Sequence, residues 1–188
     1  MQDYKKIKKA IEDLLIGVGH PADDVNILET PDRVAKMFGE ILDGYYINPT
    51  QYLKLFPSSN KEMVVVRNAP FYSYCAHHLQ PFFGKMTIGY IPNGSVLGLS
   101  KLIRIGRTFA KKLQLQEGLT KEVADFLYLN LDSKGVAVNI KAQHMCMIIR
   151  GVRSYGAETV TNMFLGDFID DLQLRREFLA NVSDKEGY

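Results

Sequence analysis

Both cysteines of the chain and three of its four histidines fall in two short segments that lie far apart in the sequence. The first segment, from residue 75, reads Cys-Ala-His-His, and the second, from residue 144, reads His-Met-Cys. Cys75 and His78 stand three residues apart, a spacing that lets two side chains reach one metal ion. Zinc prefers sulfur and nitrogen ligands in a tetrahedral site, so the segments offer four candidate ligands. A fold that uses them must bring the two segments together.

The cysteines also have simpler interpretations. Free cysteines are often plain buried residues, and a disulfide between Cys75 and Cys146 would require an oxidising compartment. The histidines beside both cysteines favour a metal site over either alternative. Residues 136–149 alternate as in a strand, which would place His144 and Cys146 on one face. A catalytic zinc keeps one position open for water, so we expect three protein ligands and a spare histidine.

The composition indicates one globular domain that is large enough for a real core. The chain has 188 residues, of which 46% are hydrophobic. A formal net charge of +2 gives no reason to expect nucleic acid as a partner. No apolar run reaches the roughly 18 residues of a membrane span, and the first residues lack the apolar stretch of a secretory signal. We therefore expect a cytoplasmic protein, whose cysteines stay reduced and available to a metal.

Hydrophobic periodicity and turn residues predict a mixture of helices and strands. Helices are expected over residues 3–16 and 30–43, from N-caps at Ser100 and Thr120, and over residues 171–180. Strands are expected over residues 63–68, 85–91, 136–149 and 158–168. Residues 116–118 are expected to end the helix that begins at Ser100, and Cys75 to His78 to lie in a loop or at a strand end.

This order of elements favours an α+β fold. Two pairs of strands that flank two helices suit an antiparallel four-stranded sheet with helices on one face. Residues 1–61 would then form an N-terminal helical arm, and residues 62–188 one compact domain. The edges of such a sheet are surfaces that oligomerisation can cover.

Basic residues gather near the start of the helix expected at Ser100. Lys101, Arg104 and Arg107 oppose the helix macrodipole there, and a bound anion would relieve that conflict. A solvated basic face is the alternative. On the helix over residues 30–43, Arg33 and Lys36 lie on one side and are interpreted as surface charges.

The chain resembles GTP cyclohydrolase I, of the tunnelling-fold group, from roughly residue 5 to residue 180. The resemblance is carried by nine segments in order: Glu29 to Met37, Cys75 to His78, Pro81 to Lys85, Tyr90 to Pro92, Gly98 to Leu102, Leu113 to Glu117, Gly135 to Val138, His144 to Cys146 and Arg150 to Arg153. It implies a tunnelling fold for the antiparallel sheet and a catalytic role for the domain that carries it.

The resemblance also implies a reaction and an assembly. Members of this family open the imidazole ring of GTP at C8, release formate, rearrange the ribose and close a pterin ring, which gives 7,8-dihydroneopterin triphosphate. This is the first step of folate and pterin biosynthesis. They assemble as decamers of two stacked pentamers with active sites between subunits, so that a monomer of this chain would lack a complete site.

Matched position by position, the resemblance implies residue roles. The zinc ligands would be Cys75, His78 and Cys146, and the acid/base residues would be His77 and His144. Guanine would be read by Gln116 and Glu117. The triphosphate would be held by Ser100, Lys101, Arg104 and Arg150, with Arg33 and Lys36 as further candidates.

Elementary chemistry agrees with these roles. Zinc activates water near neutral pH, and C8 of guanine becomes electron-poor once N7 accepts a proton, which a histidine can give. The carboxylate of Glu117 can accept hydrogen bonds from guanine N1–H and the 2-amino group together, a donor pair that adenine lacks. Cations near a helix N-terminus suit a triphosphate.

Three positions depart from the family pattern. Relatives usually carry glutamate where Ala76 stands and arginine where Gly118 stands, and the segment from Ile105 to Thr108 also differs. One hypothesis is that the glutamate and arginine were partners and were lost together, since breaking a buried ion pair costs about 3–5 kcal/mol. A second is functional: a carboxylate beside the metal could order water or the ribose.

The departures leave other functions open. The alternative is a paralogue that stops at the ring-opened formamidopyrimidine or acts on another purine nucleotide because of Ala76. A non-catalytic nucleotide-binding assembly is disfavoured, because a binder has no need of an open metal site. A nitrile reductase of the same fold group is disfavoured as well, because its cysteine nucleophile would lack the zinc partners found here.

Overall fold

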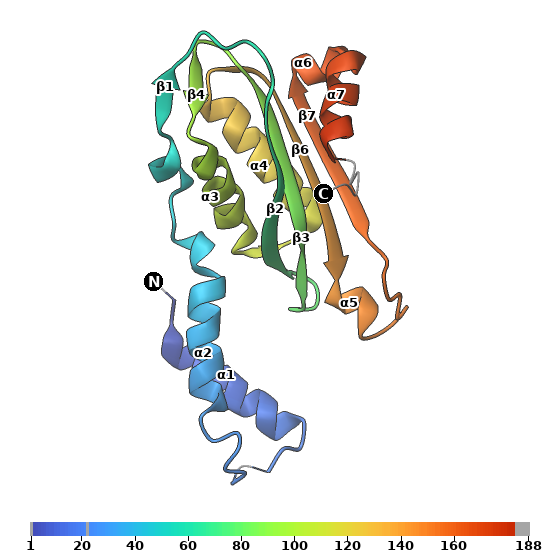
Figure 1. Cartoon of the computed structure of the whole chain (residues 1–188). Helices are drawn as coiled ribbons and strands as arrows, with labels where there is room; N and C mark the ends of the chain where they lie inside the picture. The colour runs from blue at the N-terminus through green and yellow to red at the C-terminus, as the bar shows by residue number, and fades with distance from the viewer. Residues whose placement is uncertain (1, 22, 183–188) are drawn as a thin grey trace.

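The structure of the chain is a computed structural model, and it describes residues 2–21 and 23–182. Its centre is a sheet of four long antiparallel strands, to which a two-residue strand is added at one edge (Figure 1). The strands, in sheet order, are β5 (Leu113–Gln114), β2 (Val64–Cys75), β3 (Pro81–Pro92), β6 (Ser133–His144) and β7 (Thr159–Gly166). The four long strands confirm the predicted antiparallel sheet, and β5 runs parallel to the end of β2.

The pairing of β3 with β6 fixes the end of the sheet where the two cysteine segments meet. The register runs from Phe82 opposite His144 to Pro92 opposite Ser133. The strand expected over residues 136–149 therefore ends early, and the next residues form the short helix α5 (Met145–Ile148). The prediction that His144 and Cys146 share a strand face was wrong. β6 ends early because its partner strand, β3, begins at Pro81, and proline has no N–H to extend the hydrogen-bonded ladder.

One face of the sheet carries the main helical layer. It consists of α3 (Leu99–Ala110) and α4 (Gln116–Asn130), which contact β2 and β6–β7 respectively. Met86, Ile88 and Tyr90, alternate residues of β3, are buried in this layer with apolar residues of α3 and α4. The buried core here includes Met86, Ile88, Tyr90, Leu102, Ile105, Phe109, Val123 and Leu127.

A second, smaller helical layer covers part of the opposite face. It is formed by α6 (Asp167–Asp170) and α7 (Leu172–Val182), near the strand ends remote from α5 (Figure 1). Phe178 packs on Gly89 so closely that a Cβ at residue 89 would lie 2.8 Å from its ring. The sequence predicted helices on one face only, from the order of strands and helices along the chain.

Two helix boundaries differ from the predictions. α3 begins at Leu99 with Gly98 as N-cap, so Ser100 lies in the first turn and is not the cap. α4 begins at Gln116, so residues 116–118 start a helix and do not end one. Thr120 therefore lies inside α4, where its hydroxyl donates to the carbonyl of Gln116 at 2.7 Å. The cause is β5, whose pairing with β2 leaves room for only a short connection between the helices.

The N-terminal residues form two helices that project from the sheet (Figure 1). These are α1 (Tyr4–Gly17) and α2 (Thr30–Ile41), which contact each other. The chain then returns to the sheet unit through η1 (Asp43–Tyr45), η2 (Pro49–Tyr52) and β1 (Leu55–Pro57), which pairs with β4 (Ser95–Leu97). The division of the chain at residue 61 stays a prediction. Within the described residues, the helices are too short and too polar to cross a membrane.

Candidate metal centre and nucleotide site

Three candidate ligands converge at one end of the sheet. Cys75 is the last residue of β2, His78 lies in the following turn, and Cys146 lies in α5. Their ligand atoms all lie within 4.8 Å of one another, and Cys75 Sγ is 3.9 Å from His78 Nδ1. A tetrahedral zinc ion separates such atoms by about 3.5–3.8 Å, given its bond lengths to sulfur and nitrogen. Two thiols and one imidazole in this arrangement fit zinc and leave a fourth position for another ligand.

The turn between β2 and β3 presents this first half of the site. The N–H of Cys75 donates to the carbonyl of Gln80 at 2.8 Å, and the N–H of Leu79 donates to the carbonyl of Cys75 at 2.9 Å. Leu79 has a φ of 52°, a conformation that costs a non-glycine residue on the order of 1–3 kcal/mol. The backbone of the turn thus holds His77 and His78 outside the ladder and exposed, as the sequence predicted for a strand end.

The two cysteines are free thiols in this structure. Burial and the neighbouring Cys75 raise the pKa of the Cys146 thiol, and the charge of Arg150 acts in the opposite direction. A bound divalent cation would favour the thiolate form of both. Arg150 therefore belongs to the surroundings of the metal centre, although the sequence suggested it only as a phosphate ligand.

A second group of polar side chains adjoins the centre. His144, the last residue of β6, stacks on Phe82 with ring centroids 4.6 Å apart and planes 3° apart. Its Nε2 lies 2.8 Å from Oε1 of Gln116, in the first turn of α4. Burial lowers the pKa of His144, and the exposed carboxylate of Glu117 partly opposes that shift. His77 lies beside the candidate ligands instead, with its ring 6.1 Å from that of His78.

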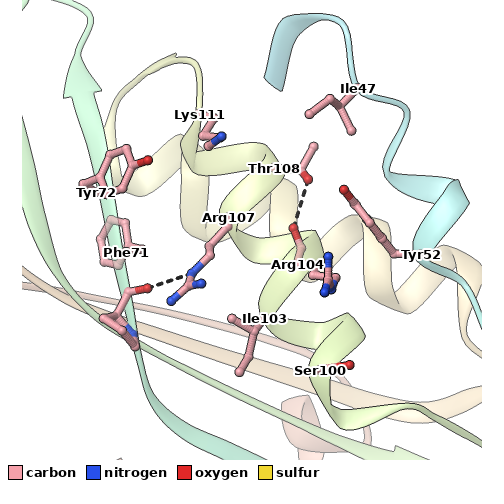
Figure 2. A pocket seen from close by; sticks show the side chains of 11 residues that line it. Ile47, Tyr52, Phe71, Tyr72, Ser100, Ile103, Arg104, Arg107, Thr108 and Lys111 are labelled. Atoms are coloured by element: carbon pink, nitrogen blue, oxygen red, sulfur yellow. Dashed lines mark hydrogen bonds between the residues drawn. The ribbon is translucent and has the colours of Figure 1, made fainter. Parts of the chain in front are cut away.

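Arg104 and Arg107, two of the basic residues of α3, line a separate pocket. Its volume is about 750 Å³, and it lies between α3, the middle of β2 and the segment around η2 (Figure 2). The lining comprises Ile47, Tyr52, Pro70, Phe71, Tyr72, Ser100, Ile103, Arg104, Arg107, Thr108 and Lys111. Arg107 donates from Nε to the carbonyl of Pro70 at 3.1 Å, and Lys111 pairs with Asp43 at 3.0 Å. Lys101 lies over the ring of Tyr52, 5.9 Å from its centroid.

The structure thus divides the predicted site residues into groups. Those near the metal centre are Cys75, His77, His78, Gln116, Glu117, His144, Cys146 and Arg150. Those on α3 are Ser100, Lys101 and Arg104, and none of the pocket's lining residues belongs to the first group. Arg33 and Lys36 lie on α2 in the arm, where Arg33 pairs with Glu29 at 3.3 Å.

The sequence did not reveal every residue that shapes these groups. Phe82 lies opposite His144 because of the β3–β6 register, and the sequence around either residue does not predict that contact. Thr161 of β7 contacts Gln116 for the same kind of reason. Arg107 had been grouped with Lys101 and Arg104 as a basic residue of this helix but not as a phosphate ligand, and its i, i+3 spacing from Arg104 agrees with their place in one pocket.

The residues that departed from the family pattern lie beside this site. The N–H of Ala76 donates to the carbonyl of Gln114 at 3.0 Å. A Cβ added at Gly118 would meet only the side-chain oxygen of Gln114, at 3.7 Å, so larger residues have room there. Both positions therefore border Gln114, which is compatible with the hypothesis that they once held partners.

Comparisons with known proteins agree with this arrangement. The profile of the GTP cyclohydrolase I family matches residues 7–183. GTP cyclohydrolase 1 of Clostridium perfringens is 44% identical over 184 residues, which cover 97% of this chain and all of that protein. GTP cyclohydrolase 1 of Brevibacillus brevis is 45% identical over 180 residues, which cover 95% of this chain and 96% of that protein.

A solved structure with a similar arrangement is that of the archaeosine synthase QueF-Like in its apo form. It has a TM-score of 0.45 and 18% sequence identity, and the match covers 58% of this chain and 97% of that one. The sequence relatives bear the name of the cyclohydrolase itself, and nothing in them favours the alternative of a paralogue with another product. The family match, which includes both cysteine segments and the whole sheet, accounts for the tunnelling fold. The chain belongs to the GTP cyclohydrolase I family.

Proposed function

We propose that this chain converts GTP to 7,8-dihydroneopterin triphosphate and formate at a site built around zinc. The observation that carries the proposal is the convergence of Cys75, His78 and Cys146 beside His144 and Glu117. Family membership supports GTP as the substrate and the opening of the guanine ring as the reaction. We place the enzyme in the cytoplasm, at the start of folate and pterin synthesis, because a reducing compartment keeps both thiols available.

The donor set supports zinc as the metal. Thiolate and imidazole ligands are those that zinc prefers, and three of them leave one position for water or substrate. When bound, zinc supplies the Lewis acidity that makes water reactive near neutral pH. Cys75 and His78 come from one turn and Cys146 from another element, so formation of the site depends on the folded sheet.

Glu117 provides recognition of the guanine base. Its carboxylate is exposed in the first turn of α4 and close enough to His144 to oppose part of the lowering of the His144 pKa that burial causes. A carboxylate accepts two hydrogen bonds from guanine N1–H and the 2-amino group. Adenine leaves the same carboxylate without donors, which is a large penalty in a closed site.

His144 and His77 provide the proton transfers. One protonates N7 of guanine, which makes C8 a better electrophile, and further transfers accompany ring opening and the ribose rearrangement. Burial lowers the pKa of His144, which favours the neutral ring that can accept a proton. His77 lies in the exposed turn, where substrate could reach it.

The triphosphate requires residues from a second copy of the chain. Ser100 lies ten residues before the end of α3, about 15 Å along the helix from the turn that leads to β5 and Cys75. Arg104 lines the pocket (Figure 2), whose lining includes none of the three candidate ligands. We therefore assign Ser100, Lys101 and Arg104 to the site of a neighbouring subunit, and Arg150 to the site of its own chain.

The sheet has edges that suit such an assembly. In the described part of the chain, β7 pairs on one side only, and β5 covers β2 only at Tyr74 and Cys75. Strand edges left open in this way are commonly covered by other chains. We propose two stacked rings of five subunits, with each site formed between subunits. Arg33 and Lys36, on the arm, are further candidates for contact with substrate or with the second ring.

One experiment tests the proposed function directly. The zinc-loaded protein is incubated with GTP, and formate, pterin fluorescence and nucleotide mass are followed together. Equal amounts of formate and dihydroneopterin triphosphate are expected. A ring-opened nucleotide without pterin would show that the reaction stops early, and the absence of any product with zinc bound would contradict the assignment of GTP.

A further inference from the structure

Gln116 is one of the most deeply buried polar residues of the chain, although it adjoins the candidate site. Only 2% of its surface is exposed. Its side chain reaches from the first turn of α4 across the edge of β6 to β7. A residue that reads guanine would present its amide to the substrate. Gln116 instead directs both polar atoms of its side chain to groups of its own chain.

The orientation of this amide is fixed by its partners. Nε2 lies 3.1 Å from the carbonyl of Ile140 and 3.0 Å from the carbonyl of Thr159. Carbonyl oxygens only accept hydrogen bonds, so the NH₂ group must face them. A flipped amide would place its oxygen against two other oxygens. Oε1 therefore points to His144 Nε2, at 2.8 Å.

Two threonines complete the network and determine its direction. The hydroxyl of Thr120 donates to the carbonyl of Gln116 at 2.7 Å, which uses its only proton. Thr161 lies 2.7 Å from the same hydroxyl and must therefore donate to it. The oxygen of Thr161 is then an acceptor for Gln116 Nε2, at 3.1 Å. The direction of each threonine hydroxyl is thus fixed, and the two N–H protons of Gln116 face three acceptors, the carbonyls of Ile140 and Thr159 and the hydroxyl of Thr161.

The network dictates which nitrogen of His144 carries a proton. Oε1 of Gln116 can only accept, so Nε2 of His144 must donate to it. In the neutral ring Nδ1 then carries the lone pair, and among the described residues it has no hydrogen-bond partner. Stacking on Phe82 fixes the plane of the ring as well. The imidazole is thus held by one contact at its face and one at its edge.

We propose that Gln116 is a positioning residue that fixes the orientation and tautomer of His144 and leaves Nδ1 as the nitrogen that exchanges protons with the substrate. The inference rests on the proposed acid/base role of His144. It changes the role that family resemblance suggested for Gln116, because guanine recognition through side chains falls to Glu117.

The first test reads the tautomer without turnover. Zinc-loaded protein labelled with ¹⁵N-histidine is studied by long-range ¹⁵N–¹H correlation, and the His144 signals are identified by their loss in His144→Asn. A proton on Nε2 is expected. A proton on Nδ1 would overturn the proposal, whether or not the enzyme turns over GTP, so this result is independent of the proposed function.

The second test separates positioning from guanine recognition. Gln116→Leu should lower kcat by about 10–100-fold, the usual effect of losing a partner that orients a reactive side chain, with KM for GTP and bound zinc nearly unchanged. Its His144 signals should become a mixture of tautomers. A rise in KM of tenfold or more with kcat unchanged would show that Gln116 binds guanine and would overturn the proposal.

A milder pair of variants covers the case in which Gln116→Leu does not fold. Thr161→Val removes one hydroxyl from the network, whereas Thr161→Ser keeps it. Thr161→Val should lower kcat by about twofold to tenfold, the range for one neutral hydrogen bond, and Thr161→Ser should restore the wild-type value. Equal kcat and equal His144 signals in Thr161→Val and the wild type would contradict the network.

Discussion

The metal-centre end of the sheet and the basic pocket of α3 are organised in opposite ways. At the metal centre, side chains from β2, β6, α4 and α5 hold one another: Gln116 contacts His144, and Cys75 lies near both His78 and Cys146. In the pocket, Arg104 and Arg107 are exposed on one helix, and only Arg107 has a hydrogen bond across to the sheet. One region is complete within the chain, and the other faces outward.

The difference suits a division of tasks, with metal binding and proton transfer in one region and triphosphate binding in the other. Groups that move protons or bind a metal need fixed geometry, and burial with many partners supplies it. Groups that hold a flexible, highly charged triphosphate need mainly positive charge within reach, and exposed arginines supply that. A site split between two subunits can therefore be rigid on the side of the chemistry and adaptable on the side of the phosphates.

The largest expected effect concerns the metal-centre end. Cys146→Ser removes one of the three ligands and should abolish stable zinc binding, and with it turnover by on the order of 10³-fold or more. Zinc content after dialysis and formate release from GTP are the measurements. Met145→Leu, which changes the neighbouring residue of α5 but no ligand atom, is the matched control. Full zinc retention in Cys146→Ser would show that Cys146 is not a ligand.

A mixing experiment tests whether the two regions belong to one site on different chains. Cys146→Ser and Arg104→Ala are co-expressed with different tags, and assemblies that contain both are purified. If each site combines the metal centre of one chain with α3 of its neighbour, roughly a quarter of the sites will carry both wild-type halves. Activity near that fraction is expected. Activity no higher than the sum of the two variants alone would show that one chain supplies both regions.

Within the pocket, Arg104 and Arg107 should contribute unequally to the binding of GTP. Among the described residues Arg104 has no ion pair, so its guanidinium is available to a phosphate, whereas Arg107 already donates to Pro70. Arg104→Ala should raise KM for GTP by about 10–100-fold, the range for one hydrogen bond to a charged group, and Arg107→Gln by less. Guanosine binding, which involves no phosphate, should change in neither variant. An equal loss of guanosine binding would indicate a folding defect.

A substitution on the face of α3 that packs against the sheet tests how this helix, which lines the pocket, is held in place. Gly106 packs so closely on β3 that a Cβ there would lie 2.7 Å from Sδ of Met86, which is buried. Gly106→Val should therefore lower the free energy of unfolding by about 1–3 kcal/mol, as overpacked cores do. Adding Met86→Val should recover part of that loss, which denaturant titration of the four proteins would measure. Additive effects of the two substitutions would show that the residues do not share this space.

The sequence was most informative where the chemistry is local. The turn from Cys75 to His78 holds two ligands within four residues, so spacing alone predicted their proximity. The partner segment was found by composition, because it carries the other cysteine. Its conformation was predicted wrongly, since the strand ends where its neighbour begins at Pro81, and that register depends on residues more than sixty positions away.

The other incorrect predictions also depended on contacts between residues that are far apart in the sequence. Gly118 looked like the end of a helix, but the pairing of β5 with β2 makes it part of the first turn of α4. The partners of Gln116 lie on two strands far along the chain, so its function could not be read from neighbouring residues. Family resemblance supplied roles for individual residues, and only the three-dimensional contacts show that Gln116 is buried against His144 and β7 whereas Glu117, the next residue, is exposed.

The smallest expected effect is that of a substitution in the N-terminal helical arm, which within one chain lies away from both the metal centre and the basic pocket. Asp32 of α2 accepts hydrogen bonds from Lys8 Nζ at 2.8 Å and from the hydroxyl of Tyr4 at 2.5 Å. These bonds lower the pKa of Asp32, and the bond from Lys8 is the main cause. A lowered pKa means that folding favours the carboxylate. The resulting stability is therefore present above the unfolded value of about 3.9 and is lost as pH falls through the folded pKa.

Asp32→Asn should accordingly be slightly less stable than the wild type at pH 7, and the difference should shrink as pH falls below about 4. Urea titrations across this pH range measure it, and high salt should reduce it because the pair is exposed. Bound zinc and KM for GTP should stay unchanged, since neither region contacts Asp32. A change in either would mean that the arm takes part in the site, which would join the two regions through the helices that precede them.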